Sequence, residues 1–363
     1  MSTEHQWPRE VFSFAIALQN LIWGAFQPVA GWMADRFGAR RVLWGASLLY
    51  VLGLIGMAFA TTGVGMAASA GLLIGMAQSG STYSVVYAAM GKLVPENRRT
   101  WSMGVVAAAG SFGQFLMIPT ASSLIGGLGW FVTLLIFAAS AFLIAPLGTA
   151  LTRGLTVTKV GAGQTASEAL REAFRDRSFL LLTAGYFVCG FQVVFIGVHF
   201  PSYLLDKGLG AETGVTALAL IGLFNVFGSY GVGHLAGRFQ KRYLLATIYF
   251  SRSVLITAFL LLPLTPWSVY VFSAIIGLLW LSTVSPTNAI VAQIFGLRYF
   301  GMLSGVVFFS HQVGSFMGVW LGGRLFDTTG SYDVVWIICI ALGVVAGLLN
   351  LPVDERHPAA KLA

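Results

Sequence analysis

Three ionisable side chains lie inside long apolar stretches of the sequence: Arg252, His311 and His199. All 13 Asp and Glu residues fall between such stretches or at their ends. A charged group in hydrocarbon is costly unless it is paired or hydrated, so each of the three residues is a candidate for function. A guanidinium binds a carboxylate through two hydrogen bonds, and an imidazole changes its charge near neutral pH. The pattern predicts a site for a small organic anion at Arg252 and His311, with His199 at an outer gate.

Neutral polar side chains in the apolar stretches can complete such a site. Tyr83 and Tyr87 are four residues apart, which places them on one helix face. The substrate-binding candidates are His311, Arg252, Gln312, Tyr83, Tyr87, Gln19 and Asn225. A structural alternative stays open for each of them: Arg252 can bond backbone carbonyls, and the other side chains can join neighbouring helices.

The elements that must position these residues are membrane spans. Of the 363 residues, 57% are hydrophobic and 9% are charged, whereas a soluble domain has about 25% charged residues. The mean hydropathy is +0.81. This composition excludes a soluble enzyme and predicts an all-α membrane protein. Eleven apolar runs are expected to cross the bilayer, namely 11–33, 42–61, 64–90, 101–125, 130–150, 179–204, 213–236, 243–263, 267–292, 301–323 and 333–352.

The basic residues predict the orientation of these spans. With the predicted boundaries, 17 of the 21 Lys and Arg residues lie on one side of the membrane and three on the other. Cytoplasmic loops carry the excess of positive charge, so we expect a cytoplasmic C-terminus and an extracytoplasmic Met1. A plasma or inner membrane location follows.

One long polar connection divides the chain. Residues 151–178 separate five spans from six and carry a short amphipathic stretch, whose Thr165 and Glu168 fit a capping box. We therefore predict an N-terminal bundle at 1–150, a cytoplasmic linker at 151–178, a six-helix bundle at 179–353 and a cytoplasmic tail at 354–363. A linker without a helix is the alternative.

The two halves share a repeated pattern. The run Gly31-x-x-x-Asp35-Arg36-x-Gly38-x-Arg40-Arg41 ends the first span, and a weaker copy, from Gly233 to Arg242, follows 202 residues later. This run resembles the signature loop of the major facilitator superfamily. The resemblance implies two six-helix bundles with a substrate cavity between them. This chain would carry the second to twelfth helices, and we expect the family's first helix to precede Met1.

In that family the aspartate of the loop helps to latch the cytoplasmic side. The resemblance therefore implies a latch at Asp35, whereas the second copy has Gly237 in its place. A solvated loop that only sets orientation is the alternative. The gating candidates are Gly31, Asp35, Arg36, Gly38, Arg40, Arg41, Arg238 and His199.

Softer patterns, such as Ser310-His-Gln-Val-Gly314, resemble the monocarboxylate and oxalate–formate branch. We expect a secondary transporter that moves a small organic anion with a proton or in exchange, as a monomer in the bilayer. The alternatives are an exporter of neutral or amphiphilic compounds, and a membrane sensor or inert short form. The sequence has no nucleotide-binding loop, no Cys/His cluster for a metal and no catalytic triad. We expect no enzyme activity, no cofactor and no nucleic-acid partner.

Overall fold

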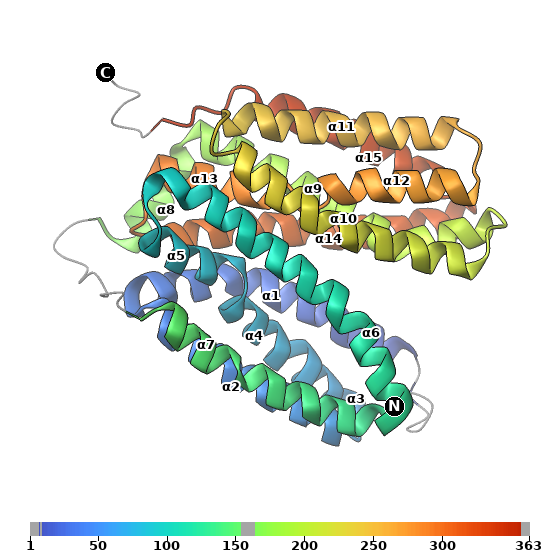
Figure 1. The fold of residues 1–363 in the computed structure, drawn as a ribbon, viewed down its shortest axis with the longest axis horizontal. Coiled ribbons are helices and arrows are strands. Elements are labelled where there is room, and N and C mark those ends of the chain that lie inside the picture. The colour runs from blue at the N-terminus through green and yellow to red at the C-terminus, as the bar shows by residue number, and fades with distance from the viewer. Residues whose placement is uncertain (1–6, 8, 154–163, 357–363) are drawn as a thin grey trace. The chain divides into compact units, whose positions relative to one another are not determined.

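The computed structural model describes residues 7, 9–153 and 164–356, and the regular elements in these ranges are all helices (Figure 1). Helices satisfy their backbone hydrogen bonds internally, which a chain in hydrocarbon requires. Eight of the helical segments are long and apolar enough to cross a membrane. The chain is therefore an all-α membrane protein.

The helices group into two compact units. Unit 1 comprises 1–93, 117–170 and 297–309, and unit 2 comprises 94–116, 171–296 and 310–363. The predicted division of the chain at the 151–178 linker stays a prediction. Unit 1 contains α1 (Arg9–Phe37), α2 (Ala39–Phe59), α3 (Gly63–Met66), the π-helical stretch η1 (Ala67–Leu73), α4 (Ile74–Ser81), α5 (Tyr83–Leu93), α7 (Ile144–Leu151), most of α6 (Glu96–Phe142) and the start of α14 (Phe300–Thr329).

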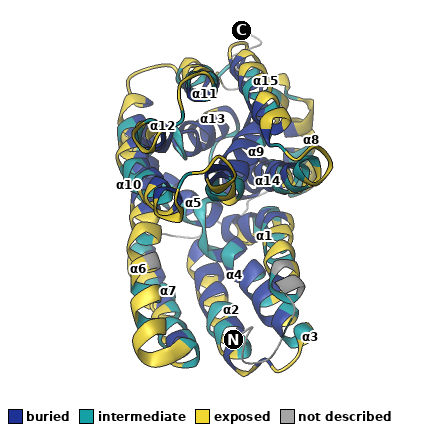
Figure 2. Ribbon diagram, turned by 90° about the vertical axis from the view of Figure 1, so that its right-hand side faces the viewer, coloured by how far each residue is buried: buried dark blue, intermediate teal, exposed yellow. Residues whose placement is uncertain are grey.

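Unit 2 has an aromatic core. Phe259 and Phe272 stack with ring centroids 4.2 Å apart, and Trp336 and Phe200 pack around them. Figure 2 shows α9 and α13 mostly as buried. The elements of unit 2 are α9 (Arg177–Asp206), α10 (Ala211–Leu235), α11 (Lys241–Leu261), α12 (Pro266–Leu279), α13 (Val284–Phe295), α15 (Asp333–Asn350), the start of α6, the end of α8 (Ala166–Arg175) and the rest of α14.

Several expected spans differ in their continuity. The runs 101–125 and 130–150 lie on one helical stretch, Glu96–Leu151, with a kink at Gly129, where φ is 79°. The run 64–90 is divided among α3, η1, α4 and α5, and the run 267–292 is broken between α12 and α13. Hydropathy does not show such breaks, because the residues at a break can be as apolar as those of a helix.

Two local signals shape the ends of helices near the candidate residues. Gly38 separates α1 from α2 with φ at 89°, a conformation that favours glycine. At α8, the backbone N–H of Thr165 donates to Glu168 Oε2 (2.6 Å), and the N–H of Glu168 donates to Thr165 Oγ1 (3.3 Å). This reciprocal pair is a capping box, so a short helix is present within the connection.

Candidate functional site

The last turn of α1 places Asp35 against the first turn of α14 within unit 1. Its carboxylate oxygens accept hydrogen bonds from the backbone N–H groups of Gly301 (3.2 Å) and Met302 (2.9 Å), and the side chain is 6% exposed. The first N–H groups of a helix lack partners within the helix and form its positive end, so a carboxylate is stabilised there.

Asp35 lies beyond the predicted span 11–33, in the cytoplasmic loop of the predicted orientation. Burial raises its pKa from 3.8 to about 7. The hydrogen bonds from Met302 and Gly301 and the positive charge of Lys92 act in the opposite direction. The carboxyl group can therefore change its charge near neutral pH.

Glycines allow the helices to approach closely at this contact. A Cβ on Gly31 would overlap the backbone of Gly301. In unit 2, a Cβ on Gly233 would lie 2.5 Å from the Cα of Gly104. The 202-residue repeat therefore places corresponding glycines at close contacts in both units. The second copy has Gly237 where the first has its acid, so only the first copy adds a carboxylate.

The arginine side chains of the signature loop are exposed at the protein surface. Arg36 lies over the rings of Trp32 and Phe37, with 5.5 Å from its guanidinium carbon to each ring centroid. Three further arginines from the two copies of the loop are gating candidates and are also exposed, namely Arg40, Arg41 and Arg238. These side chains are therefore accessible to solvent in this conformation.

The polar face of α1 contacts α4 in unit 1. Gln19 Nε2 donates to Gln78 Oε1 (3.0 Å), which joins the two helices. Tyr83 and Tyr87, in α5, have ring centroids 5.5 Å apart. Tyr87 is fully buried, and its hydroxyl has no hydrogen-bond partner among the described residues. Gln19 thus serves helix packing here, and the Tyr87 hydroxyl makes no hydrogen bond to the described residues.

Arg252 lies in α11 and is 1% exposed. Its guanidinium donates to the carbonyls of Leu279 and Trp280, and Nη1 donates to Gln192 Oε1 (3.3 Å). These carbonyls lie at the C-terminal end of α12, where helix carbonyls lack partners and the dipole is negative. In this conformation Arg252 stabilises the break between α12 and α13, which is the structural alternative considered above.

Asn225 contacts the same break from α10. Its Oδ1 accepts from the backbone N–H of Leu281 (3.0 Å) and from Ser229 Oγ (3.2 Å), and its Nδ2 donates to Ser111 Oγ (2.8 Å). Asn225 thereby joins α10 to α6 and to the segment between α12 and α13. These three hydrogen bonds use its side chain for structure.

We expect Asn225→Ala to lower the free energy of unfolding by about 1 kcal/mol, since interhelical hydrogen bonds in membranes contribute roughly this amount. Thermal unfolding of the detergent-purified chain measures the change. Asn20→Ala is the matched control, because the Asn20 amide is exposed and donates to Ile16 within its own helix. Equal unfolding temperatures for the two variants would show that the contacts of Asn225 are not stabilising.

His311 lies in α14 and is 7% exposed. Its Nδ1 lies 3.2 Å from Gln312 Oε1 and 3.4 Å from Ser315 Oγ, and its ring centroid is 5.0 Å from that of Tyr186. A Cβ on Gly190 would overlap the backbone of His311, so α9 and α14 pack closely at this level. The imidazole therefore sits among polar groups that can orient it.

His199 lies two turns of α9 beyond Gln192. Its Nδ1 is 3.3 Å from Tyr332 Oη, and its Nε2 is 3.0 Å from the carbonyl of Val319. These contacts join α9 to α14 and to the start of α15. His199 and Tyr332 are thus placed where a change in one helix would alter the hydrogen bonds of the others.

A polar cluster in unit 2 connects several of these side chains. Arg252 bonds Gln192, the thiol of Cys189 lies 3.1 Å from Thr283 Oγ1, and Arg252 and His311 both interact with Cys189. This cluster comprises Cys189, Gln192, Arg252, Thr283 and His311. The candidates Gln19, Tyr83 and Tyr87 belong to unit 1 instead.

The sequence interpretation did not select Thr283, Cys189 or Tyr186 as site residues. One signal was available: Tyr186, Cys189 and Gln192 recur every third residue, which places them near one face of α9. Thr283 offered no such signal, because it lies in the break between α12 and α13.

Comparisons with known proteins agree with the all-α membrane fold of this chain. The sequence profile of the Major Facilitator Superfamily matches residues 1–319. YcxA of Bacillus subtilis (strain 168), described as an uncharacterised transporter of this type, is 22% identical over 97% of this chain and 88% of its own length. Monocarboxylate transporter 11 of Mus musculus is 25% identical over 96% of this chain and 79% of its own length.

Solved structures resemble this chain as well. The E. coli fucose:proton symporter FucP superposes with a TM-score of 0.73 at 14% identity, covering 94% of this chain and 91% of FucP. FucP in its outward conformation gives a TM-score of 0.77 at 13% identity, with coverage of 93% and 89%. At such low identity, the likeness shows the fold alone.

Proposed function

Because this chain belongs to the major facilitator superfamily, we propose that it moves a small organic anion by alternating access, with a proton or in exchange for a second anion. The monocarboxylate transporters among its relatives support this substrate class. We further propose a cytoplasmic C-terminus, because the predicted spans place 17 of the 21 Lys and Arg residues on that side.

The observation that carries the proposal is the environment of His311. The imidazole is almost fully buried beside Gln312, Ser315 and Tyr186, in a segment that contains no acidic residue near it. The imidazole, the Gln312 amide and the Ser315 hydroxyl can each donate a hydrogen bond to an organic carboxylate.

The contact of Asp35 with the start of α14 supports a gate in the same protein. A contact that joins α1 to α14 through one carboxylate can form in one conformation and break in another. We therefore assign Asp35 to the latch of a cytoplasmic gate. Tyr87 is proposed as a further ligand contact, because its hydroxyl is buried and free of partners among the described residues.

The test is uptake against pH in proteoliposomes. We expect wild-type uptake of L-lactate, pyruvate or acetate to rise as the external pH falls from about 8 to about 6, because a carboxylate that enters together with a proton is driven by the inward proton gradient. His311→Gln keeps a polar side chain but removes the imidazole, so it should flatten this dependence.

His234→Gln is the matched control, since His234 is exposed at the end of α10 and has no place in the proposed site. Its pH profile should match that of the wild type. Identical profiles for His311→Gln and the wild type would remove His311 as the coupling group. Failure of the wild type to take up any of the three acids would overturn the monocarboxylate class.

A further inference from the structure

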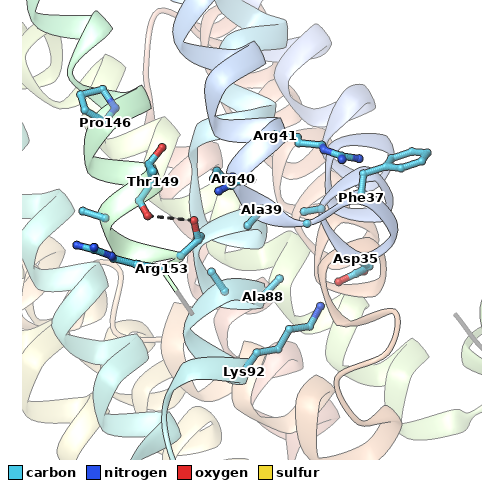
Figure 3. Close-up of a pocket in the computed structure, with 15 residues that line it drawn as sticks. Asp35, Phe37, Ala39, Arg40, Arg41, Ala88, Lys92, Pro146, Thr149 and Arg153 are labelled. Atoms are coloured by element: carbon cyan, nitrogen blue, oxygen red, sulfur yellow. Dashed lines mark hydrogen bonds between the residues drawn. The ribbon is translucent and has the colours of Figure 1, made fainter. Parts of the chain in front are cut away.

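A cavity of about 540 Å³ lies within unit 1, where α1 ends, α2 begins and α5 and α7 end (Figure 3). Its volume falls within the range of roughly 300–1,000 Å³ that small-molecule sites occupy. All of its lining residues belong to unit 1. None of the substrate-binding candidates lines it, so it is separate from the proposed transport site.

The charged side chains that line this cavity are mainly cationic. Arg40, Arg41, Lys92 and Arg153 come from α2, α5 and the end of α7, and all four are exposed. Figure 3 shows them spread around the cavity, with the Lys92 ammonium on the side of Asp35. Asp35 is the acidic residue of the lining, and both of its oxygens already accept backbone hydrogen bonds. Most of the positive charge is therefore available to a ligand.

The backbone adds to this preference for an anion. The N-cap of α2 is Gly38, which has no side-chain cap, and the first turn of α2 contains no acidic residue. Gly38, Ala39, Arg40 and Arg41 all line the cavity. The N–H groups at the start of a helix favour negative charge, and phosphate is the ligand that they commonly hold.

The remaining walls are largely apolar. Phe37 and Pro146 line the cavity together with Ala34, Ala88 and Ala150. A phosphate group can meet the basic residues while the carbon-rich part of the same molecule contacts these walls. A small inorganic anion uses the basic residues alone.

We infer that this cavity binds the phosphate group of an anionic ligand, and that Arg40, Lys92 and Arg153 hold it. The proposed orientation places the cavity on the cytoplasmic side, where anionic phospholipid headgroups and soluble phosphorylated compounds are both present. The inference goes beyond the proposed transport of an organic anion and does not depend on the identity of that substrate.

The experiment compares two charge-matched variants of the full chain. Arg40→Gln/Lys92→Gln/Arg153→Gln removes one cation from α2, one from α5 and one from just after α7. Arg171→Gln/Arg175→Gln/Arg177→Gln removes three exposed cations from α8 and the start of α9, which do not line the cavity. Native mass spectrometry in detergent measures the binding of phosphatidylglycerol, with phosphatidylcholine as the zwitterionic comparison. The shift of the unfolding temperature with added inorganic phosphate measures the soluble source.

We expect the cavity variant to bind phosphatidylglycerol at least about tenfold more weakly than the control variant, since each cation near an anionic headgroup contributes about 1 kcal/mol. That outcome would identify the ligand as an anionic lipid. If inorganic phosphate raises the unfolding temperature of the wild type and the control but not of the cavity variant, the ligand is a soluble phosphate compound. Equal behaviour of the two variants in both arms overturns the proposal.

A separate single variant distinguishes a loss of binding from misfolding of the triple variant. Arg153→Gln changes one exposed side chain just after the end of α7, so the fold should be unaffected. It should show the same preference as the triple variant to a smaller degree, about fivefold for one cation. Wild-type affinity in this variant, together with a lowered unfolding temperature in the triple variant, also overturns the proposal.

Discussion

Replacing Arg252 by lysine is expected to lower the free energy of unfolding by about 3 kcal/mol, a typical cost of disrupting a buried, hydrogen-bonded charge. The guanidinium donates hydrogen bonds to the carbonyls of Leu279 and Trp280 and to the side-chain oxygen of Gln192 at the same time. An ammonium keeps the charge but loses the planar set of donors that reaches these three acceptors. The end of α12 would then be left with unsatisfied carbonyls.

Thermal unfolding and folded yield of the detergent-purified chain measure this effect. Arg324→Lys is the control, because Arg324 is exposed. For the chains that fold, the KM for the proposed monocarboxylate substrate should stay near the wild-type value. A raised KM for Arg252→Lys at an unchanged unfolding temperature would assign Arg252 to substrate binding instead.

The break that Arg252 stabilises illustrates what sequence patterns miss. The residues from Trp280 to Thr283 contain neither glycine nor proline, and the apolar run continues across them. The break depends on partners from other helices, since Arg252 and Asn225 bond the backbone at Leu279, Trp280 and Leu281. Hydropathy predicts that a segment enters the bilayer, but it does not show whether its helix is continuous.

Only those parts of the candidate site that depend on the type of a side chain could be predicted from the sequence. Asp35 was selected because the run from Gly31 to Arg41 resembles the family's signature loop, in which an acid holds this position. Its partners are the backbone N–H groups of Gly301 and Met302, more than 260 residues later, and a backbone group has no signature in sequence. The amide of Gln19 was likewise visible as polar, whereas its bond to Gln78 follows from helix packing.

Replacing Asp35 by asparagine is expected to reduce transport by about tenfold at equal abundance, because a carboxylate at a helix N-terminus with two N–H donors contributes roughly 1–2 kcal/mol. The amide has one acceptor oxygen in place of two, and its NH₂ group would face an N–H donor of α14. The contact would weaken, and the population would move toward the conformation in which it is broken. Asp327→Asn, an exposed acid in α14, is the control and should transport like the wild type.

The difference between the wild type and Asp35→Asn should also depend on pH. Burial raises the pKa of Asp35 to about 7 while the contact is formed, whereas a hydrated Asp titrates near 3.9. The contact state therefore takes up a proton more readily than the open state, and its relative stability rises as the pH falls through about 7.

Because asparagine does not titrate, the ratio of wild-type to Asp35→Asn transport should consequently be smaller at about pH 8 than at about pH 6. Taking the ratio at each pH removes the contribution of His311, which both proteins share. Quantitative immunoblotting of the proteoliposomes verifies equal abundance. Equal transport by the wild type and Asp35→Asn at both pH values would remove the latch, because the carboxylate and its two hydrogen bonds to α14 would then be dispensable.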